Sequence, residues 1–543
     1  MEDSVFNQIP FDGDRLSKED EQSLEDVVEI LLGKAVGDPR KPTERAKIWR
    51  RYVALDRYSQ APYEGAPDIT TPLIRQKVDG IRAHIESAID QSPMFLVDTD
   101  DAKIASVAPD MERLMESLIE VTESRFPIMQ AIRDAVEVGT GIVKHFMLRD
   151  PQGNSVPATR YVPFEDIFVF PSNNVRIRDV NFFERYQESL STIKKNSKEG
   201  IYWSDKLAEN KVFEGVSDDE WNELHELWEA WVWFRGDLYE VRYSREWGLL
   251  SYRLSDWGKI LDRAPYDPVY IEPSQLSFWG DSIPQILEGL QEVNDRAFQY
   301  ELARAQFAMA PPTVVSPMSD LARQLKEYGG WKPGVVLEGT FDPQNDLFTP
   351  FTQLNPFNMQ MMQLVGQMAE AASVPDMLIP GRPTSGRKTA TEVSITTSSG
   401  SQKLKNYLSA VGRSLRKHAQ AKWSLIAYYI LKVPDAASST RFTWIVNGRE
   451  TVPEQQMRLQ QIQYLLNPQF LQLIQMSQQD PFLRAVLEAF LSYLDLPGLG
   501  AKFRRMMGEQ GGIGQAIIGG VSGAASAAPG QSGGYGPAGT GSR

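Results

Sequence analysis

A basic loop that runs directly into a long helical stretch, over residues 374–432, most constrains what this chain can fold into. The loop is broken by prolines and glycines, and it carries Arg382, Arg387 and Lys388 against the single acid Asp376. Beyond it, apolar residues recur every three or four positions, which places them on one stripe of an α-helix. These are Leu404, Leu408, Val411, Leu415, Ala419, Trp423, Ile426 and Ile430. The stretch predicts a helix that packs one side against a neighbour.

The cations of this helix fall mainly on the side opposite the apolar stripe, because successive residues turn by about 100°. They are Lys403, Lys405, Arg413, Arg416 and Lys417. Lys422 interrupts the apolar stripe. The pattern predicts a helix with an apolar side and a cationic side, and it fits a channel wall and a subunit interface equally well.

A basic loop followed by a helix that opens with the sequence TATEV resembles the tunnel-loop region of portal proteins from tailed bacteriophages, in the style of short-tailed phages. Members of that family assemble as rings, commonly of twelve chains, at one capsid vertex, and the ring is the channel for DNA. The resemblance implies an α+β, multidomain fold that forms a homododecamer. It also implies that Arg382, Arg387 and Lys388 line the narrowest channel and contact the phosphates of double-stranded DNA transiently.

The rest of the chain follows the order of parts that the resemblance implies, over roughly residues 45 to 500. We expect a wing of helices and strands over 1–280, a stem helix over 281–310, a clip over 311–354, a second stem helix over 355–373, a tunnel loop over 374–400, a tunnel helix and return to the wing over 401–450, a helical crown over 451–510 and a disordered tail over 511–543. The order of these parts supports the resemblance more than any single motif does.

Local patterns in the first 140 residues predict helices. Ser17, followed by acids, predicts a helix over 17–32 that ends at Gly33. The apolar spacing of Leu73, Val78, Ile81, Ile85 and Ile89 predicts another. A single helix over about 111–138 is expected to end where Gly139 and Gly141 turn the chain into a strand.

Residues 155–270 contain short apolar runs separated by prolines and glycines, which predicts strands. Within this part, 227–254 has the pattern of three strands joined by turns near Gly236 and Gly248. Seven of the 12 tryptophans lie within 155–270. Large aromatic side chains on short strands favour a packed core over a ligand site. Arg235-Gly236-Asp237 is expected to be a turn rather than an adhesion motif.

Two helices are predicted on either side of the Pro- and Gly-rich segment 311–352. Ser282 and Gln285 have the spacing of a capping box, and the first helix should be about 40 Å long. The second helix follows Pro356, and its expected buried side comprises Phe357, Met361, Leu364, Val365, Met368 and Ala372. In portals the order helix, small insert, helix is that of stem, clip and stem. The resemblance implies that the clip docks terminase, head-completion or adaptor proteins and tail proteins, while major capsid and scaffold proteins contact the ring's flanks.

The composition limits the classes of function. The net charge of −14, from 57 basic and 71 acidic side chains, argues against a protein that coats DNA non-specifically, but suits a conduit that touches DNA at few points. The chain has no cysteine, which excludes disulfides and thiolate metal sites. We see neither a signal peptide nor an apolar run long enough to span a bilayer. We therefore expect no membrane partner, and the resemblance implies a virion location, after assembly in the host cytoplasm.

An enzyme is the main alternative class. Residues 381–389 nearly match the phosphate loop of nucleotide-driven motors, but Arg387 displaces Lys388 from the position that the loop geometry requires. A packaging ATPase is therefore kept as an alternative to the portal, and so is a structural or scaffold ring without DNA contact. Cations that serve salt bridges between subunits are the alternative to cations that touch DNA.

No other constellation of residues indicates catalysis. The four histidines, His84, His145, His225 and His418, show no ligand spacing, so each is expected at the surface or as a satisfied core residue. Asp98, Asp100 and Asp101 lack the glycine and glutamate of a calcium loop and are expected in a solvated loop. We expect neither an enzyme nor a bound cofactor or metal.

Overall fold

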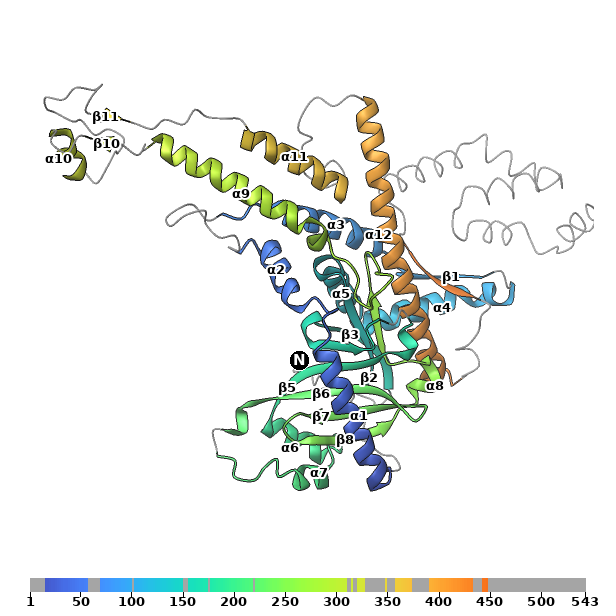
Figure 1. The fold of residues 1–543 in the computed structure, drawn as a ribbon. Coiled ribbons are helices and arrows are strands. Elements are labelled where there is room, and N and C mark those ends of the chain that lie inside the picture. Colours follow the sequence, from blue (N-terminus) through green and yellow to red (C-terminus); the bar gives the residue numbers. More distant parts are fainter. Residues whose placement is uncertain are drawn as a thin grey trace, which may run out of the picture. The chain divides into compact units, whose positions relative to one another are not determined.

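The computed structural model describes residues 15–56, 69–99, 102–149, 155–173, 176–217, 220–309, 314–315, 320–327, 347–348, 357–373, 390–432 and 442–447. All of them belong to the first of two compact units, residues 1–451. They form a mixed α and β fold with four separate antiparallel sheets, which confirms the predicted mixture of helices and strands (Figure 1). The predicted crown and tail lie outside the described residues.

Three helices open the described chain: α1 (Lys18–Val36), α2 (Thr43–Ala54) and α3 (Leu73–Ile89). The Ser17 side chain caps α1 by accepting a hydrogen bond from the Asp20 amide, as predicted. The predicted end at Gly33 is wrong, because the helix continues to bury Ala35 and closes at Gly37. The predicted apolar side of α3 is buried, apart from the partly exposed Leu73.

The single helix predicted over 111–138 is instead two helices, α4 (Ala102–Val121) and α5 (Arg125–Val138). The chain breaks where Glu123 takes a left-handed conformation with φ of 49°, and Arg125 restarts the helix while its guanidinium binds Asp90 at 2.7 Å. Pro127 marks this break, because a proline is tolerated in the first turn of α5 but would disrupt a helix that ran through without interruption. The predicted end of α5 is confirmed, since Gly139 has φ of 92° and a strand begins at Gly141.

That strand is the centre of a three-stranded antiparallel sheet. The order is β3 (Ser155–Val162), β2 (Gly141–Arg149), β9 (Tyr266–Val269). The register places His145 opposite Thr159 on one side and Val143 opposite Asp267 on the other. This pairing brings together residues that lie more than a hundred positions apart in the sequence.

A five-stranded antiparallel sheet carries three of the tryptophans on its central strand. Its order is β4 (Ile167–Phe170), β5 (Asn181–Ser189), β6 (Leu224–Phe234), β7 (Asp237–Ser244) and β8 (Gly248–Leu254). β6 to β8 confirm the predicted three strands and both turns, including the turn at Arg235 and Gly236. The predicted aromatic core is also confirmed: the seven tryptophans are buried or packed against buried clusters, namely Trp203, Trp221, Trp228, Trp231, Trp233, Trp247 and Trp257.

Short helices connect these strands. They are α6 (Leu190–Lys198), α7 (Ser204–Glu209), α8 (Trp257–Leu261) and three 3₁₀ turns at Phe164–Asp166, Ile177–Asp179 and Glu220–Asn222. α1 packs across the five-stranded sheet through Leu24, Val28 and Leu32. The result is an interior of aromatic and aliphatic side chains under a helix that is acidic on its outer side.

Charged residues are also buried between the two larger sheets. The Lys144 ammonium on β2 binds Glu184 at 3.1 Å and also Glu229, and the Arg242 guanidinium binds Glu229 and Glu240, each at 2.8 Å. All five side chains are almost completely shielded from solvent. Each ion has an opposite charge beside it, which offsets the cost of removing it from water.

Two long helices flank the predicted clip. They are α9 (Ile283–Met309) and α11 (Phe357–Ala372), and between them the structure describes β10 (Val314–Val315), α10 (Asp320–Glu327) and β11 (Leu347–Phe348). The start of α9 is confirmed: Ser282 Oγ accepts a hydrogen bond from the Gln285 amide at 3.0 Å. α11 packs along α9 and is tied to it where Asn358 donates to Glu301.

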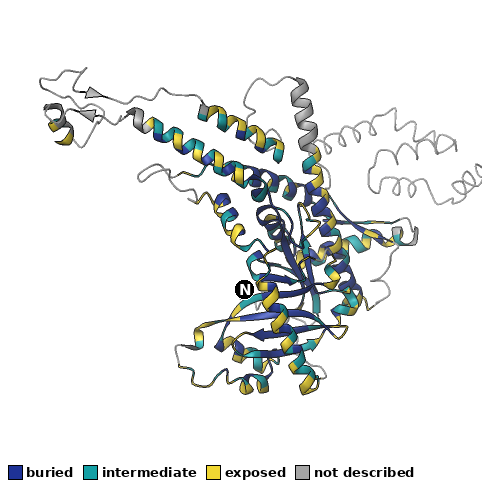
Figure 2. Ribbon diagram, viewed as in Figure 1, coloured by how far each residue is buried: buried dark blue, intermediate teal, exposed yellow. Residues whose placement is uncertain are grey.

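The predicted buried side of α11 is partly wrong. Val365 is buried, but Leu364 and Met368 are each 50% exposed. Figure 2 shows α9 and α11 as largely intermediate or exposed ribbons. The reason is that α11 meets the rest of the chain on one narrow side, so a helix with a broad apolar surface leaves part of it uncovered.

The predicted long helix is α12 (Ala390–Leu425), which continues as a short π-helical stretch, Ile426–Ile430. Its start at Ala390 means that residues 390–400, assigned to the tunnel loop, are helical. After it, β12 (Thr443–Val446) pairs antiparallel with β1 (Phe95–Asp98). The end of the described chain is thereby joined to its first half.

Candidate functional site

The tunnel-loop cations Arg382, Arg387 and Lys388 lie outside the described residues, as does the near-match to a phosphate loop. The five cations predicted on the helix, Lys403, Lys405, Arg413, Arg416 and Lys417, all lie on α12 and their side chains are described. The candidate site is therefore built from the cationic side of α12.

The two sides of α12 differ as the sequence predicts. The apolar stripe is buried against the rest of the chain, except for the exposed Ile430 at its end. On the other side Lys405, Arg413 and Lys417 are exposed, while Lys403 and Arg416 are partly exposed. Burial of one stripe anchors the helix, and it fixes the cations on the outer side as a consequence.

The cations differ in what they bind. Lys403 Nζ donates to the carbonyl of Ala371 at 2.5 Å, which ties α12 to the end of α11. Arg413, Arg416 and Lys417 form no ion pair with any described residue. The Nε of Arg416 is enclosed and has no hydrogen-bond partner among the described atoms. Positive charge is thus left unbalanced over the middle of the helix.

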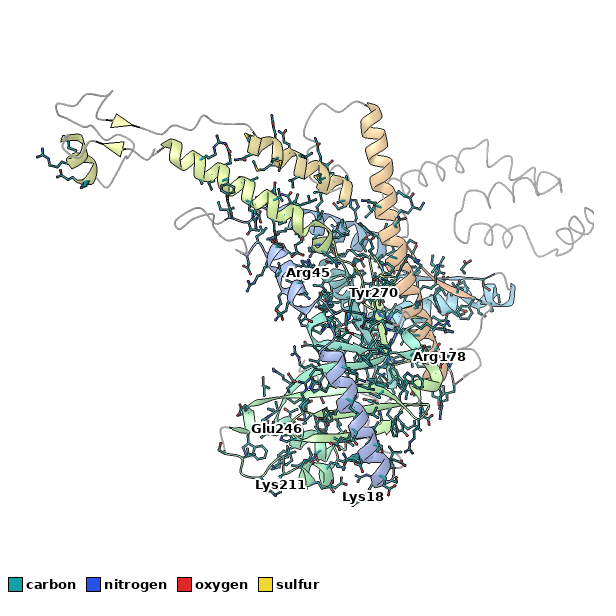
Figure 3. The ribbon with its side chains drawn as sticks, in the orientation of Figure 1. Lys18, Arg45, Arg178, Lys211, Glu246 and Tyr270 are labelled. Atoms are coloured by element: carbon teal, nitrogen blue, oxygen red, sulfur yellow. The ribbon has the colours of Figure 1, made fainter. Side chains whose placement is uncertain are left out.

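Two neighbouring cavities lie beside these cations. The larger, about 580 Å³, includes Lys403 and Arg413 together with the acid Glu272. The smaller, about 320 Å³, lies between α12 and the segment that follows β9, and Arg413, Arg416 and Lys417 all border it. Tyr270, labelled in Figure 3, forms part of its wall, and its amide donates to Ser414 Oγ of α12 at 3.4 Å. The surface can hold an anion, because its cations converge on a concave space.

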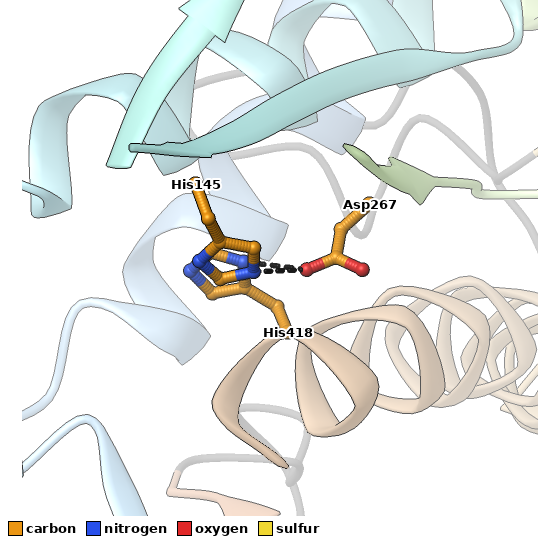
Figure 4. A group of neighbouring side chains, drawn as sticks. All are labelled: His145, Asp267 and His418. Carbon is orange, nitrogen blue, oxygen red and sulfur yellow. Dashed lines mark hydrogen bonds and ion pairs between the residues drawn. The ribbon is translucent and has the colours of Figure 1, made fainter. Parts of the chain in front are cut away.

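The buried side of α12 contains a second polar cluster. His145 of β2 and His418 of α12 stack with ring centroids 4.4 Å apart and planes 10° from parallel. His145 Nε2 donates to Asp267 Oδ2 at 2.6 Å, and His418 Nδ1 donates to the same oxygen at 3.0 Å (Figure 4). Arg263 binds the other carboxylate oxygen. The prediction that these two histidines are satisfied core residues is confirmed for the side facing Asp267.

This triad has the residue types of a metal site, and its potential ligand atoms lie within 4.8 Å of one another. Its geometry does not suit a metal ion, however. Two nearly parallel imidazoles direct their lone pairs along nearly parallel lines, so one ion cannot lie in both ring planes. Arg263 also places a positive charge on the shared carboxylate. The arrangement instead stabilises the contact of α12 with the sheet through hydrogen bonds.

Burial determines the protonation of this cluster. It lowers the pKa of His145 to about 3 and also lowers the pKa of His418, although Asp267 opposes both shifts. Burial alone would raise the pKa of Asp267, but Arg263 and the imidazoles lower it well below its usual value. Both rings are therefore neutral and the carboxylate is charged at neutral pH.

Lys422, which interrupts the apolar stripe, is buried beside the same cluster. Its ammonium donates to Ser124 Oγ at 2.7 Å and to Thr159 Oγ1 at 3.4 Å, and Thr159 is 3.4 Å from His418 Nε2. Burial lowers the pKa of Lys422 to about 7. The interruption in the stripe was the one sequence signal of this cluster, because the other members are far apart in the chain.

The remaining sequence candidates do not form a site in the described part of the chain. His84 and His225 are partly exposed, as expected for histidines near the surface. Asp98 is exposed, while Asp100 and Asp101 lie outside the described residues. None of the described helices is both long and apolar enough to cross a membrane.

In comparisons with known proteins, no protein-family model matches this chain, and no curated protein matches it significantly.

Proposed function

We propose that this chain is a portal protein of a tailed phage, which forms a ring at one capsid vertex and conducts double-stranded DNA. In this role the ring docks terminase, adaptor and tail proteins through the clip and meets major capsid and scaffold proteins at its flanks. The proposed location is the virion. The proposal includes no enzymatic step and no cofactor.

The observation that carries the proposal is the uncovered apolar surface of the helix pair α9 and α11. Tyr300 is 53% exposed on α9, and Leu364 and Met368 are each half exposed on α11. Val293 and Met359 extend the same exposed apolar character along the two helices. Large apolar groups that recur along two packed helices are typical of an interface with another chain. A ring of identical chains would cover this surface at each interface.

The arrangement of elements supports the same proposal. α9 and α11 lie on either side of the short elements β10, α10 and β11, which fits stem, clip and stem. α12 adds a long helix with an anchored apolar side and a cationic outer side. In the proposed ring, repeated weak contacts of the tunnel-loop cations Arg382, Arg387 and Lys388 would hold DNA during pauses and release it during movement.

The first test is the mass of the purified protein by light scattering, with negative-stain images of the same peak. We expect about 730 kDa, for twelve chains of 61.2 kDa each, and a central hole. A matched variant, Leu364→Ser with Met368→Ser, should lose the ring while keeping the circular dichroism of the folded chain. A wild-type protein that stays at the mass of one chain at every concentration would contradict the proposal.

A second measurement separates a DNA channel from a structural ring. Arg382→Ala, Arg387→Ala and Lys388→Ala combined should leave the ring intact but reduce retention of packaged DNA, with a weaker dependence on salt. Unchanged DNA retention would favour the ring without DNA contact. ATP binding that disappears in Lys388→Ala would favour the motor.

A further inference from the structure

The smaller cavity beside α12 has the properties of a socket for an acidic group. Arg413, Arg416 and Lys417 border it, and none of them is paired with a described carboxylate. One acid also borders it, Asp267, but that carboxylate is already bound by Arg263 and two histidines. The net charge at the cavity is therefore strongly positive.

The walls of this socket are apolar and concave. They include Tyr270, Phe278 and Pro268, and the serine hydroxyls of Ser274 and Ser277 lie among them. A phosphodiester of duplex DNA has bulky sugars on both sides, so it fits a concave space less well than a single side chain does. A carboxylate on a slender side chain can enter it, and a neighbouring apolar group would cover the aromatic wall. The socket therefore fits a protein segment that combines acidic and apolar side chains.

The turn between α4 and α5 of this chain has that combination. Val121 is 73% and Phe126 is 68% exposed, which is unusual for such large apolar side chains. Glu120 and Glu123 are exposed beside them, and neither forms an ion pair within the described part of the chain. The left-handed conformation of Glu123 closes a short turn that joins the two helices. We define residues 120–126 as the acidic turn.

The socket and the acidic turn lie on different sides of α12. The turn contains Ser124, which accepts a hydrogen bond from the buried Lys422. Lys417 of the socket precedes Lys422 by five residues, which corresponds to roughly 140° around the helix. Two complementary patches on different sides of one chain suit a head-to-tail contact, which closes into a ring when the rotation is right.

We infer that the acidic turn of one chain docks into the α12 socket of a second copy of this chain. The inference rests on the proposed ring and assigns Arg413, Arg416 and Lys417 to a subunit contact rather than to DNA. Glu120 and Glu123 pair with the three cations, and Val121 and Phe126 cover the apolar wall. Each chain contributes one turn and one socket to its two neighbours.

The test uses two full-length variants with reversed charges. Glu120→Lys with Glu123→Lys changes the turn and keeps the socket, and Arg413→Glu with Lys417→Glu does the opposite. Each variant alone should lose the large assembly in light scattering. Mixed together they offer two attractive contacts, the native turn of the second with the native socket of the first, and the exchanged turn of the first with the exchanged socket of the second. The mixture should therefore regain a large assembly in which the two variants alternate.

The variant with all four substitutions should regain the large assembly, because the exchanged charges attract again. This outcome also shows that the single-site variants fail through the contact rather than through misfolding. The matched control, Glu214→Lys with Glu223→Lys, changes two exposed acids elsewhere and should assemble like the wild type.

Large assemblies in both single-site variants would overturn the inference and leave the proposed ring standing. Conversely, the wild type could form only a smaller oligomer that both variants lose and the variant with all four substitutions restores. This result would support the contact and overturn the proposed ring. A wild type that never associates would overturn both. Binding of a DNA duplex that depends on Arg413 and Lys417, with assembly unchanged, would assign these cations to DNA instead.

Discussion

Charged and apolar side chains are paired and buried in the five-stranded sheet region but left partly uncovered on the helices α9, α11 and α12. In the sheet region, buried cations such as Lys144 and Arg242 each lie beside a carboxylate. On α12, Arg413 and Lys417 have no such partner among the described residues, and Leu364 on α11 is half exposed. The sheet region therefore forms its ion pairs and apolar contacts within one chain. We expect the helices to form the corresponding contacts with another molecule.

The energetics of the two regions should differ accordingly. A buried ion that loses its partner is left uncompensated in a medium where water cannot reach it. An exposed cation that is removed costs the folded chain little, because water already solvates it. The same contrast holds for buried and half-exposed apolar side chains. Substitutions in the two regions can therefore test whether the contrast is real.

The largest effect is expected for Glu229→Gln. This substitution removes the charge that faces both Lys144 and Arg242 in the interior, so the free energy of unfolding should fall by about 3–5 kcal/mol. Arg413→Ala, on the outer side of α12, should change it by less than about 0.5 kcal/mol. Urea unfolding of dilute protein, followed by tryptophan fluorescence, measures both.

Equal effects of Glu229→Gln and Arg413→Ala would remove the contrast between the regions. Two outcomes can produce equality, and they differ in meaning. A small loss for Glu229 would show that Glu184 and Glu240, the other carboxylates beside Lys144 and Arg242, balance these buried cations without it. A large loss for Arg413 would show that this side chain already has a partner within its own chain, which would also weaken the α12 socket.

The second effect compares two leucines of the helical region. Leu415 is completely buried on α12, so Leu415→Ala should lower the free energy of unfolding by about 2–5 kcal/mol. Leu364→Ala should cost less than about 1 kcal/mol, because half of that side chain is already in water. Association should respond in the opposite order. In light scattering at high protein concentration, Leu364→Ala should weaken association more than Leu415→Ala does. A Leu364→Ala chain that unfolds as easily as Leu415→Ala would contradict this division of α11.

The sequence predicted most local structure because its signals were periodic or contained glycine and proline. The apolar stripe of α12 and the three strands from β6 to β8 are of this kind. The break at Glu123 was missed although Pro127, in the first turn of α5, signals a helix start. The exposure of Leu364 and Met368 was also missed, since an amphipathic pattern shows which side is apolar but not how much of it the fold covers.

The polar cluster under α12 shows why long-range sites escape sequence reasoning. His145 and His418 reach Asp267 across 122 and 151 positions, and only the pairing of β2 with β9 and the docking of α12 bring them together. No spacing rule covers such distances. The position of the outer cations could be predicted, because they all lie on one helix. Whether each cation has an acidic partner depends on the neighbouring segments and could not be predicted.

The smallest change in the free energy of unfolding is expected for each unit by which the pH is lowered. His145 has a pKa of about 3 in the folded chain, while an unfolded chain binds protons at its histidines near pH 6.5. Between these values the unfolded state holds more protons, so stability is full above pH 6.5 and falls as the pH drops toward 3, by about 1.4 kcal/mol per pH unit for this group. His418, whose pKa is also lowered, contributes in the same direction.

Urea unfolding between pH 6 and 4.5 separates this contribution from that of Lys422, which has a folded pKa of about 7 and is then protonated in both states. His145→Gln keeps a donor for Asp267 but cannot titrate, so its stability should fall less steeply with acid than that of the wild type. His225→Gln, at a partly exposed position near Glu246, is the matched control for the loss of a histidine outside the cluster. If His145→Gln kept the wild-type slope, proton uptake at this buried ring would not oppose the folded state. The contact of α12 with the sheet would then tolerate a charged ring beside Asp267, and the contrast between the regions would not extend to this cluster.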